Sequence, residues 1–172
     1  TDGVVQLSAA VGFDTLSRSY QTGPLAGNSA LLHGEWNMLP LRDSSYGELQ
    51  LDLQHYTRLW RTANLGFRAA GGTSFGDQFT RLFSVWPVYN LRGIPFRQSF
   101  ADVFVGKNYV VTSAELQFPL DRLIRIAIFQ NIEGVAAIDA GSVFDNLEEA
   151  QEHQTASFVT GFNFNLAIFE FR

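Results

Sequence analysis

The sequence predicts an all-β protein: an antiparallel transmembrane β-barrel of about eight strands, with a long loop folded into its lumen. The first observation is a series of runs of about ten residues in which apolar and polar side chains alternate, which is the strand period. The second is composition. The 172 residues include 16 Phe and 15 Gly, and 17% are charged, below the roughly 25% of soluble domains. The third is residues 76–108, the longest stretch without clean alternation, which lies between such runs.

Four strands are predicted before this stretch, at residues 4–14, 29–39, 46–59 and 63–75. The clearest is 46–59, where leucines at every second position alternate with Glu48, Gln50, Asp52 and Gln54. Residues 15–28 are polar and contain Gly and Pro, so they are predicted to form a loop.

Four more strands are predicted after it, at residues 109–118, 133–144, 157–168 and, incomplete, 169–172. The acidic stretch 145–154 is predicted to be a loop. Short connections then alternate with long ones at 15–28, 76–108 and 145–154, and short turns on one side with long loops on the other are typical of outer-membrane barrels.

Composition excludes several classes of function. The net charge of −5 and the pI near 5.1 argue against a nucleic-acid partner, and no cysteine is present for disulfide or thiol chemistry. No run of about 18 apolar residues predicts a membrane-spanning helix. His33, His55 and His153 have no metal-ligand spacing. We therefore predict neither an enzyme nor a cofactor.

Alternation alone fits a soluble β-sandwich or lipocalin-like barrel equally well, because those proteins turn the apolar face inward. Two features favour the membrane barrel. The polar faces carry Gln, Asn, Ser, Gly and Glu rather than the Lys-rich mixture of a solvated sheet. Aromatic residues such as Tyr46, Trp60 and Tyr109 lie at strand ends, where interfacial girdles are found.

The centre of the long loop, Leu91-Arg92-Gly93-Ile94, resembles the Val/Leu-Arg-Gly-Phe/Tyr motif of one family. This is the BamA/TamA/FhaC superfamily of outer-membrane assembly and secretion proteins, also called the bacterial surface antigen family. Stretches 113–120, 135–144 and 160–165 resemble its following strands in the same order, so the likeness covers about 86–171. Ile94 departs from the motif, where the family has an aromatic residue.

The resemblance implies roles for particular residues. In the family the loop arginine pairs with acidic residues on the inner barrel wall, and the matching residues here are Arg92, Glu115 and Asp139. Strand phasing independently places Glu115 and Asp139 on polar faces. A guanidinium that bridges two carboxylates would pin the loop inside the barrel, and Gly93 would let the backbone turn closely beneath the wall.

The resemblance also implies a location and a function. The family barrel has sixteen strands with the motif loop between the eleventh and twelfth, so the chain is expected to be the C-terminal half of a barrel in the outer membrane of a Gram-negative bacterium. It would insert outer-membrane proteins or translocate polypeptide. The implied partners are outer-membrane lipids, client polypeptides, and accessory lipoproteins or other chains of a membrane complex. The alternatives are a barrel that anchors or exports a fused N-terminal domain, patatin-like or propeller, and a self-contained eight-stranded barrel.

Overall fold

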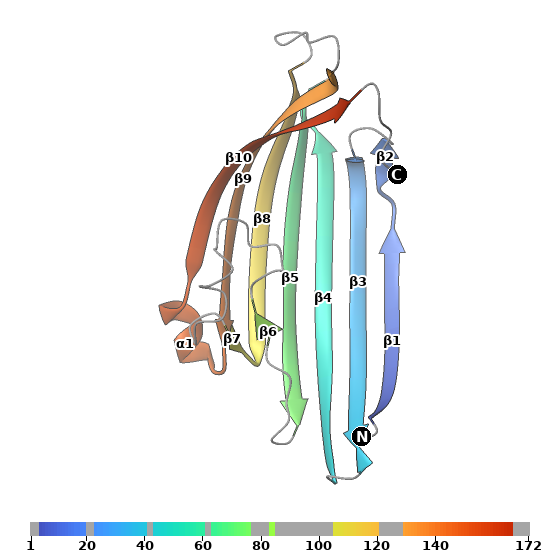
Figure 1. Ribbon diagram of the computed structural model, residues 1–172, viewed down its shortest axis with the longest axis vertical. Helices are drawn as coiled ribbons and strands as arrows, with labels where there is room; N and C mark the ends of the chain where they lie inside the picture. The colour runs from blue at the N-terminus through green and yellow to red at the C-terminus, as the bar shows by residue number, and fades with distance from the viewer. Residues whose placement is uncertain are drawn as a thin grey trace.

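The computed structural model describes residues 4–19, 23–40, 43–60, 63–76, 83–84, 105–120 and 129–166. These residues form a curved antiparallel sheet and one short helix, which confirms the predicted all-β class (Figure 1). The loop motif at 91–94 and the strand predicted at 169–172 lie outside the described residues. Within the described ranges, no helix combines the length and apolar character that crossing a membrane requires.

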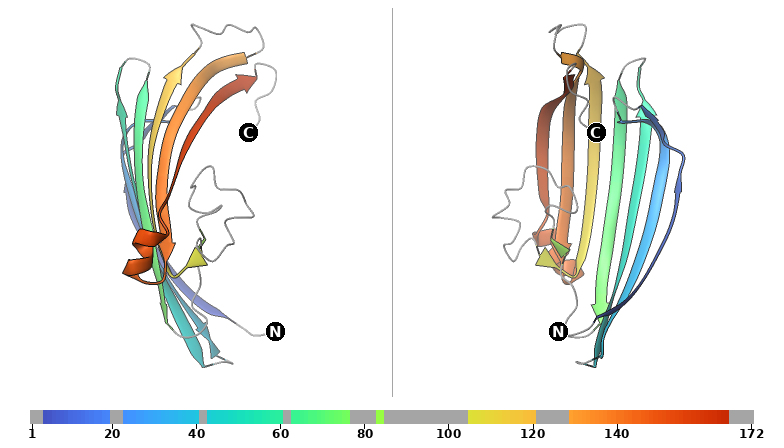
Figure 2. Two further views of the ribbon diagram at one scale, coloured as in Figure 1. Left: turned by 90° about the vertical axis from the view of Figure 1, so that its left-hand side faces the viewer. Right: turned by 45° about the vertical axis from the view of Figure 1, so that its right-hand side comes forward.

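The main sheet has eight strands in the order β1-β3-β4-β5-β8-β9-β10, with β2 paired to β3. Their bounds are β1 Val5–Asp14, β2 Ser17–Ser19, β3 Gly23–Leu39, β4 Ser44–Arg58, β5 Asn64–Gly76, β8 Asn108–Pro119, β9 Phe129–Phe144 and β10 Thr155–Leu166. A second sheet pairs β6 (Phe83–Ser84) with β7 (Val105–Gly106). The main sheet is open, with β1 and β10 at its edges, and it curves like part of a barrel wall (Figure 2).

The segment 15–28, predicted as a loop, is mostly paired backbone. The structure starts β3 at Gly23, six residues before the predicted start, and pairs it with β2. The Thr15 amide donates to the Asn28 carbonyl over 2.8 Å, so the hairpin extends beyond β1. This segment lies at the opposite end of the sheet from β6 and β7 (Figure 1), so the long connections do not share one side.

The acidic stretch 145–154, also predicted as a loop, contains helix α1 (Leu147–Glu152). The Asn146 side chain accepts hydrogen bonds from the backbone amides of Glu148 and Glu149, each over 3.1 Å. In return, the Glu149 carboxylate accepts from the Asp145 amide over 2.9 Å. This reciprocal cap satisfies two of the free amides of the first turn and the amide that precedes the N-cap. Six residues are too few to show a helical period in the sequence.

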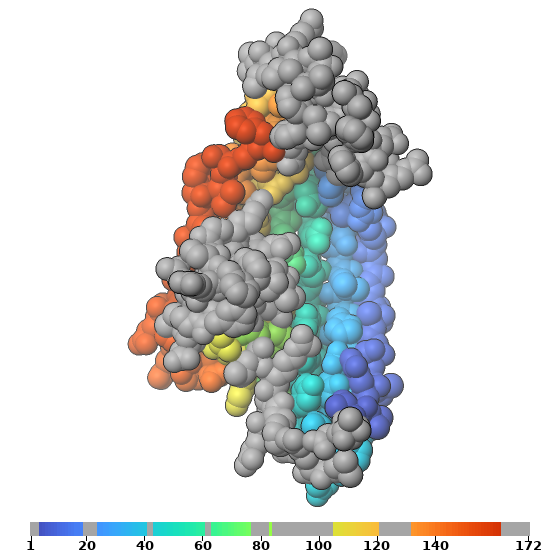
Figure 3. Space-filling view, viewed as in Figure 1, coloured from blue at the N-terminus to red at the C-terminus, as the bar shows by residue number. Residues whose placement is uncertain are grey.

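The two faces of the sheet differ sharply in chemistry. Most apolar side chains of the main sheet lie on the convex face, and many stay exposed there, as at Val11 (75% exposed) and Phe158 (69%). The strand carboxylates and most of the strand amides lie on the concave face, which Figure 3 views directly. An exception is Leu31, an exposed apolar side chain on the concave side. An apolar outer face with a polar inner face is the arrangement of a barrel that crosses a membrane.

Gly76, the last residue of β5, is a position where a side chain is expected to be costly. Its φ is +129°, and a Cβ there would lie 2.5 Å from the Ser45 carbonyl oxygen. We expect Gly76→Ala to lower the unfolding free energy by about 1–3 kcal/mol, measured as a lower urea midpoint for the detergent-refolded protein. Gly161→Ala is the matched control because a Cβ at Gly161 meets no atom of the described residues within 4 Å. Equal losses for the two variants would contradict the explanation.

Candidate functional site

The candidate site is the concave wall formed by β5, β8 and β9. Register sets which side chains meet there: Ser113 on β8 lies opposite Arg68 on β5 and opposite Asp139 on β9. Directly opposed residues share a face of the sheet. Glu115 is two residues from Ser113 and therefore lies on the same concave face. The structure thus places Glu115 and Asp139 on one wall, on neighbouring strands.

Asp139 is the most deeply buried charged side chain of this wall, with 0% exposure. Its Oδ1 atom accepts a hydrogen bond from Ser113 Oγ over 2.6 Å. A short bond from a hydroxyl to a carboxylate is a charge-assisted one, and a buried carboxylate is tolerated only when it has such partners. Sequence reasoning missed Ser113, because its contact with Asp139 depends on the register between β8 and β9.

Glu115 is held by an amide on its own strand. Its Oε1 atom accepts from Gln117 Nε2 over 2.6 Å. Glu115 lies opposite Ala137, which is two residues from Asp139 on β9. The two carboxylates are therefore diagonal neighbours, a relation that places their Cβ atoms roughly 7 Å apart or slightly less. That separation is within the span of one planar guanidinium and its five N–H donors.

A carboxylate followed two residues later by an amide recurs on the concave face of β3 and β4, next to this wall. The Glu115 arrangement is repeated by Asn37 donating to Glu35 (2.6 Å), Gln50 to Glu48 (3.3 Å) and Gln54 to Asp52 (3.2 Å). The spacing keeps both partners on one face of a strand. Amide donors orient the carboxylates but leave their negative charge in place. These carboxylate–amide pairs can be read from the sequence, but the sequence analysis identified their members only as polar-face residues and not as hydrogen-bonded partners.

Arg68 contacts Asp52 across the boundary between β5 and β4. Its Nε and Nη2 atoms donate to Asp52 Oδ2 over 3.0 and 2.6 Å. Both side chains are about three-quarters buried, with 23% and 25% exposure. This ion pair ties β4 to β5 beside the buried Asp139 and Ser113.

An aromatic anchor attaches the β6–β7 ladder to the same wall. Phe83 is 2% exposed and packs with Ala70, Tyr109, Val111 and Val143, all of which lie on the concave face. The rings of Phe83 and Tyr109 meet edge to face, with centroids 4.9 Å apart. Phe83 and Ser84 pair with Gly106 and Val105. The described ends of the predicted in-folded segment 76–108 therefore lie on the concave side; Leu91, Arg92, Gly93 and Ile94 fall outside the described residues.

Hydrogen bonds fix the chain where it leaves this ladder. Asn108 Nδ2 donates to the carbonyl oxygens of Phe144 and Asp145, over 3.2 and 3.1 Å. Its Oδ1 atom accepts from Thr73 Oγ1 over 2.8 Å. The Lys107 amide donates to Asp145 Oδ1 over 2.9 Å. Together these bonds join β5, β8 and β9 at the end of the main sheet that lies next to the β6–β7 ladder.

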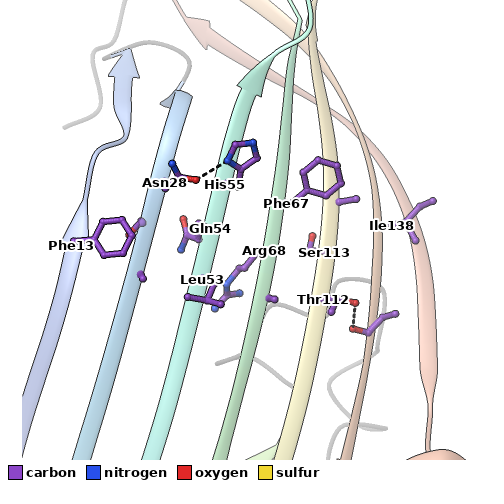
Figure 4. Close-up of a pocket in the computed structure, with 15 residues that line it drawn as sticks. Phe13, Asn28, Leu53, Gln54, His55, Phe67, Arg68, Thr112, Ser113 and Ile138 are labelled. Atoms are coloured by element: carbon purple, nitrogen blue, oxygen red, sulfur yellow. Dashed lines mark hydrogen bonds between the residues drawn. The ribbon is translucent and has the colours of Figure 1, made fainter.

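The convex face carries a shallow hollow of about 630 Å³ (Figure 4). Phe13, Leu53, Phe67 and Ile138 line it together with alanines of β3, β5, β8 and β9. At one end, His55 Nδ1 and Asn28 Oδ1 form a 2.8 Å hydrogen bond. The hollow exists because register aligns small side chains on neighbouring strands, which alternation alone cannot predict. Among the residues the structure describes, no group of three or more His, Asp or Glu side chains could hold a metal ion.

Comparison with known families agrees with this geometry. Residues 4–168 match the family model of the Omp85 superfamily domain. No curated protein sequence matched the chain. The matched range covers every strand that the structure describes, including the wall that carries Glu115 and Asp139. The chain therefore belongs to the Omp85 superfamily, whose members are outer-membrane barrels of protein assembly and secretion, as the loop motif and the strands that follow it predicted.

Proposed function

We propose that the chain is the C-terminal half of a sixteen-stranded barrel in a bacterial outer membrane. The barrel inserts outer-membrane proteins or moves polypeptide across the membrane, without a cofactor and without catalysis. The observation that carries the proposal is the two-faced sheet. Its convex side is apolar and exposed, while its concave side is a carboxylate-rich wall on which a segment of the chain is anchored. The family match supports the general class of activity.

We propose further that Arg92 reaches the wall and pairs with Glu115 and Asp139. Three observations support this pairing. The two carboxylates are diagonal neighbours, Asp139 is wholly buried, and the residues flanking 85–104 are fixed to the same face through Phe83 and its partners. A guanidinium suits the site because its fork can contact two carboxylates at once. Gly93 lets the backbone approach the wall closely. Leu91 and Ile94 stand on either side of Arg92 and Gly93 in the sequence.

In this mechanism the pinned loop keeps the inner wall in register while the barrel changes shape elsewhere. A weak seam between the first and last strands opens sideways. The unpaired strand edge then templates an incoming strand by β-augmentation. The partners are outer-membrane lipids, client polypeptides, and accessory lipoproteins or other chains of a membrane complex.

Reconstitution tests the function. The full-length protein in lipid vesicles is given an unfolded client barrel, and insertion is measured as the client's shift to heat-modifiable migration on gels. Translocation is measured as protection of a secreted polypeptide from protease. We expect one of these activities above that of empty vesicles. Absence of both, with a correctly folded barrel, would favour the anchor alternative, and the intact mass of the native protein would reveal any fused N-terminal domain.

Arg92→Ala is expected to loosen the loop. The variant loses the cation that bridges the two wall carboxylates, so trypsin should cut more readily near residues 91–97, for example after Arg97. Loss of one partner of a buried ion pair costs about 3–5 kcal/mol, so cleavage should accelerate at least about tenfold. Arg18→Ala is the control, because Arg18 forms an exposed ion pair with Asp14 at the far end of β1. Unchanged protease resistance in Arg92→Ala would count against the pairing.

A further inference from the structure

Helix α1 lies on the convex side of the sheet, opposite the β6–β7 ladder (Figure 2). Between this helix and strands β8, β9 and β10 there is a groove of about 640 Å³. We call it the α1 groove. Its floor is formed by Val110, Thr112, Ala140 and Ser142, and its helix side by Leu147 and Ala150. Among the residues that the structure describes, no charged side chain lines the groove, and most of its surface is apolar.

Ser142 gives the groove an unsatisfied hydrogen-bonding group. The residue is 2% exposed, and within the described part of the chain its Oγ atom has no hydrogen-bond partner. Two other hydroxyls on the convex face are paired: Thr112 Oγ1 donates to the Ala140 carbonyl over 3.4 Å, and Thr73 Oγ1 donates to Asn108 Oδ1 over 2.8 Å. A buried hydroxyl without a partner costs free energy. A ligand carbonyl in the groove would satisfy it.

The groove is continuous with the lipid-facing surface. Thr112 and Ala140 line both the α1 groove and the hollow of Figure 4. Register aligns Thr112, Ala140 and Ala156 in one row of small side chains across three strands. The two hollows therefore form one apolar track that starts beneath α1 and runs along the convex face. An extended hydrocarbon chain fits such a track.

The polar residues at the rim of the α1 groove favour some lipid headgroups over others. Gln151 and Gln154 line it, and the exposed Glu148 and Glu152 flank the lining residues of the helix. The last turn of α1 contains no basic residue. Carboxylates and amides accept hydrogen bonds from hydroxyl groups, whereas carboxylates repel a phosphate. The rim thus favours an uncharged, hydroxyl-rich headgroup over an anionic one.

We propose that the α1 groove binds a glycolipid. Its acyl chain lies in the apolar track, its acyl carbonyl accepts a hydrogen bond from Ser142 Oγ, and its sugar hydroxyls meet the Gln and Glu side chains of the rim. The inference rests on the membrane location proposed above for the convex face, and it adds a specific ligand site to that face.

Photo-crosslinking of the full-length protein in detergent–lipid micelles tests the site. The probe is monogalactosyl diacylglycerol with a diazirine in one acyl chain, and labelled peptides are located by mass spectrometry. Labelling within 140–156 is divided by labelling within 5–11, the part of the exposed strand β1 that lines neither hollow, which serves as the internal reference. Unlabelled monogalactosyl diacylglycerol should lower this ratio about fivefold, while phosphatidylglycerol with the same acyl chains should leave it unchanged.

Substitutions in the α1 groove test where the glycolipid probe makes contact. Ser142→Ala removes one hydrogen bond and should lower the ratio about fivefold. Ala140→Phe fills the track and should lower it to the reference level. Ala9→Phe makes the same change on β1, outside both hollows, and should have no effect on labelling within 140–156.

Three results would overturn the glycolipid site: a ratio near one in the wild-type protein, equal competition by phosphatidylglycerol, or insensitivity to both groove variants. The competition arm uses the wild-type protein, so it decides even where a variant folds poorly. Absence of labelling on β1 as well would instead count against the membrane location itself.

Discussion

Asp139→Ala is expected to lower the unfolding free energy of the barrel by about 3 kcal/mol, measured from urea midpoints of the refolded full-length protein. The carboxylate is wholly buried and accepts a 2.6 Å hydrogen bond from Ser113. Its removal leaves the Ser113 hydroxyl without this acceptor, and it leaves a cavity between β8 and β10. Each of these effects destabilises a packed wall.

The Asp139→Asn variant separates the effect of the hydrogen bond from Ser113 from the effect of the negative charge on the carboxylate. The amide oxygen can still accept from Ser113, but it carries no negative charge. If Arg92 pairs with this position, Asn should loosen the loop nearly as much as Ala does. If Ser113 is the main partner, Asn should remain close to the wild type. Asp14→Ala, which removes an exposed carboxylate paired with Arg18, is expected to cause no measurable change.

The sequence predicted which face Glu115 and Asp139 occupy, because alternation along a strand determines the face of every residue on it. It did not predict that Ser113 lies opposite Asp139. That contact depends on the pairing between two strands, and a shift of register by two residues would preserve every alternation pattern. The family resemblance supplied the functional pairing, which the strand pattern alone would not have suggested.

Other features were hidden for similar reasons. The early start of β3 depends on the hydrogen bond from the Thr15 amide to the Asn28 carbonyl and on pairing with β2, and these leave no trace in hydropathy. Helix α1 is specified by the cap between Asn146 and Glu149, a signal present in the sequence but too short to produce a periodic pattern. The α1 groove arises only when Thr112, Ala140 and Ala156 align across three strands.

Phe83→Ala is expected to have the largest effect on the in-folded segment. The buried ring packs against Tyr109, Val111 and Val143, and its loss costs about 3–5 kcal/mol. Since the ring lies on a two-residue strand rather than in the main sheet, the cost should appear as local opening of the β6–β7 ladder, not as global unfolding. Trypsin cleavage within residues 81–97 should then accelerate on the order of a hundredfold.

Phe158→Ala is the matched control, because Phe158 is 69% exposed on the convex face and is not part of this cluster. Its cleavage rate should equal that of the wild type. The salt dependence of cleavage then separates the two proposed attachments of the loop. With the aromatic anchor removed, the Arg92 ion pair would be the main remaining restraint, so added salt should accelerate cleavage of Phe83→Ala more than cleavage of the wild type. A rate in Phe83→Ala that is unchanged at every salt concentration would mean that the ladder does not hold the segment against the wall.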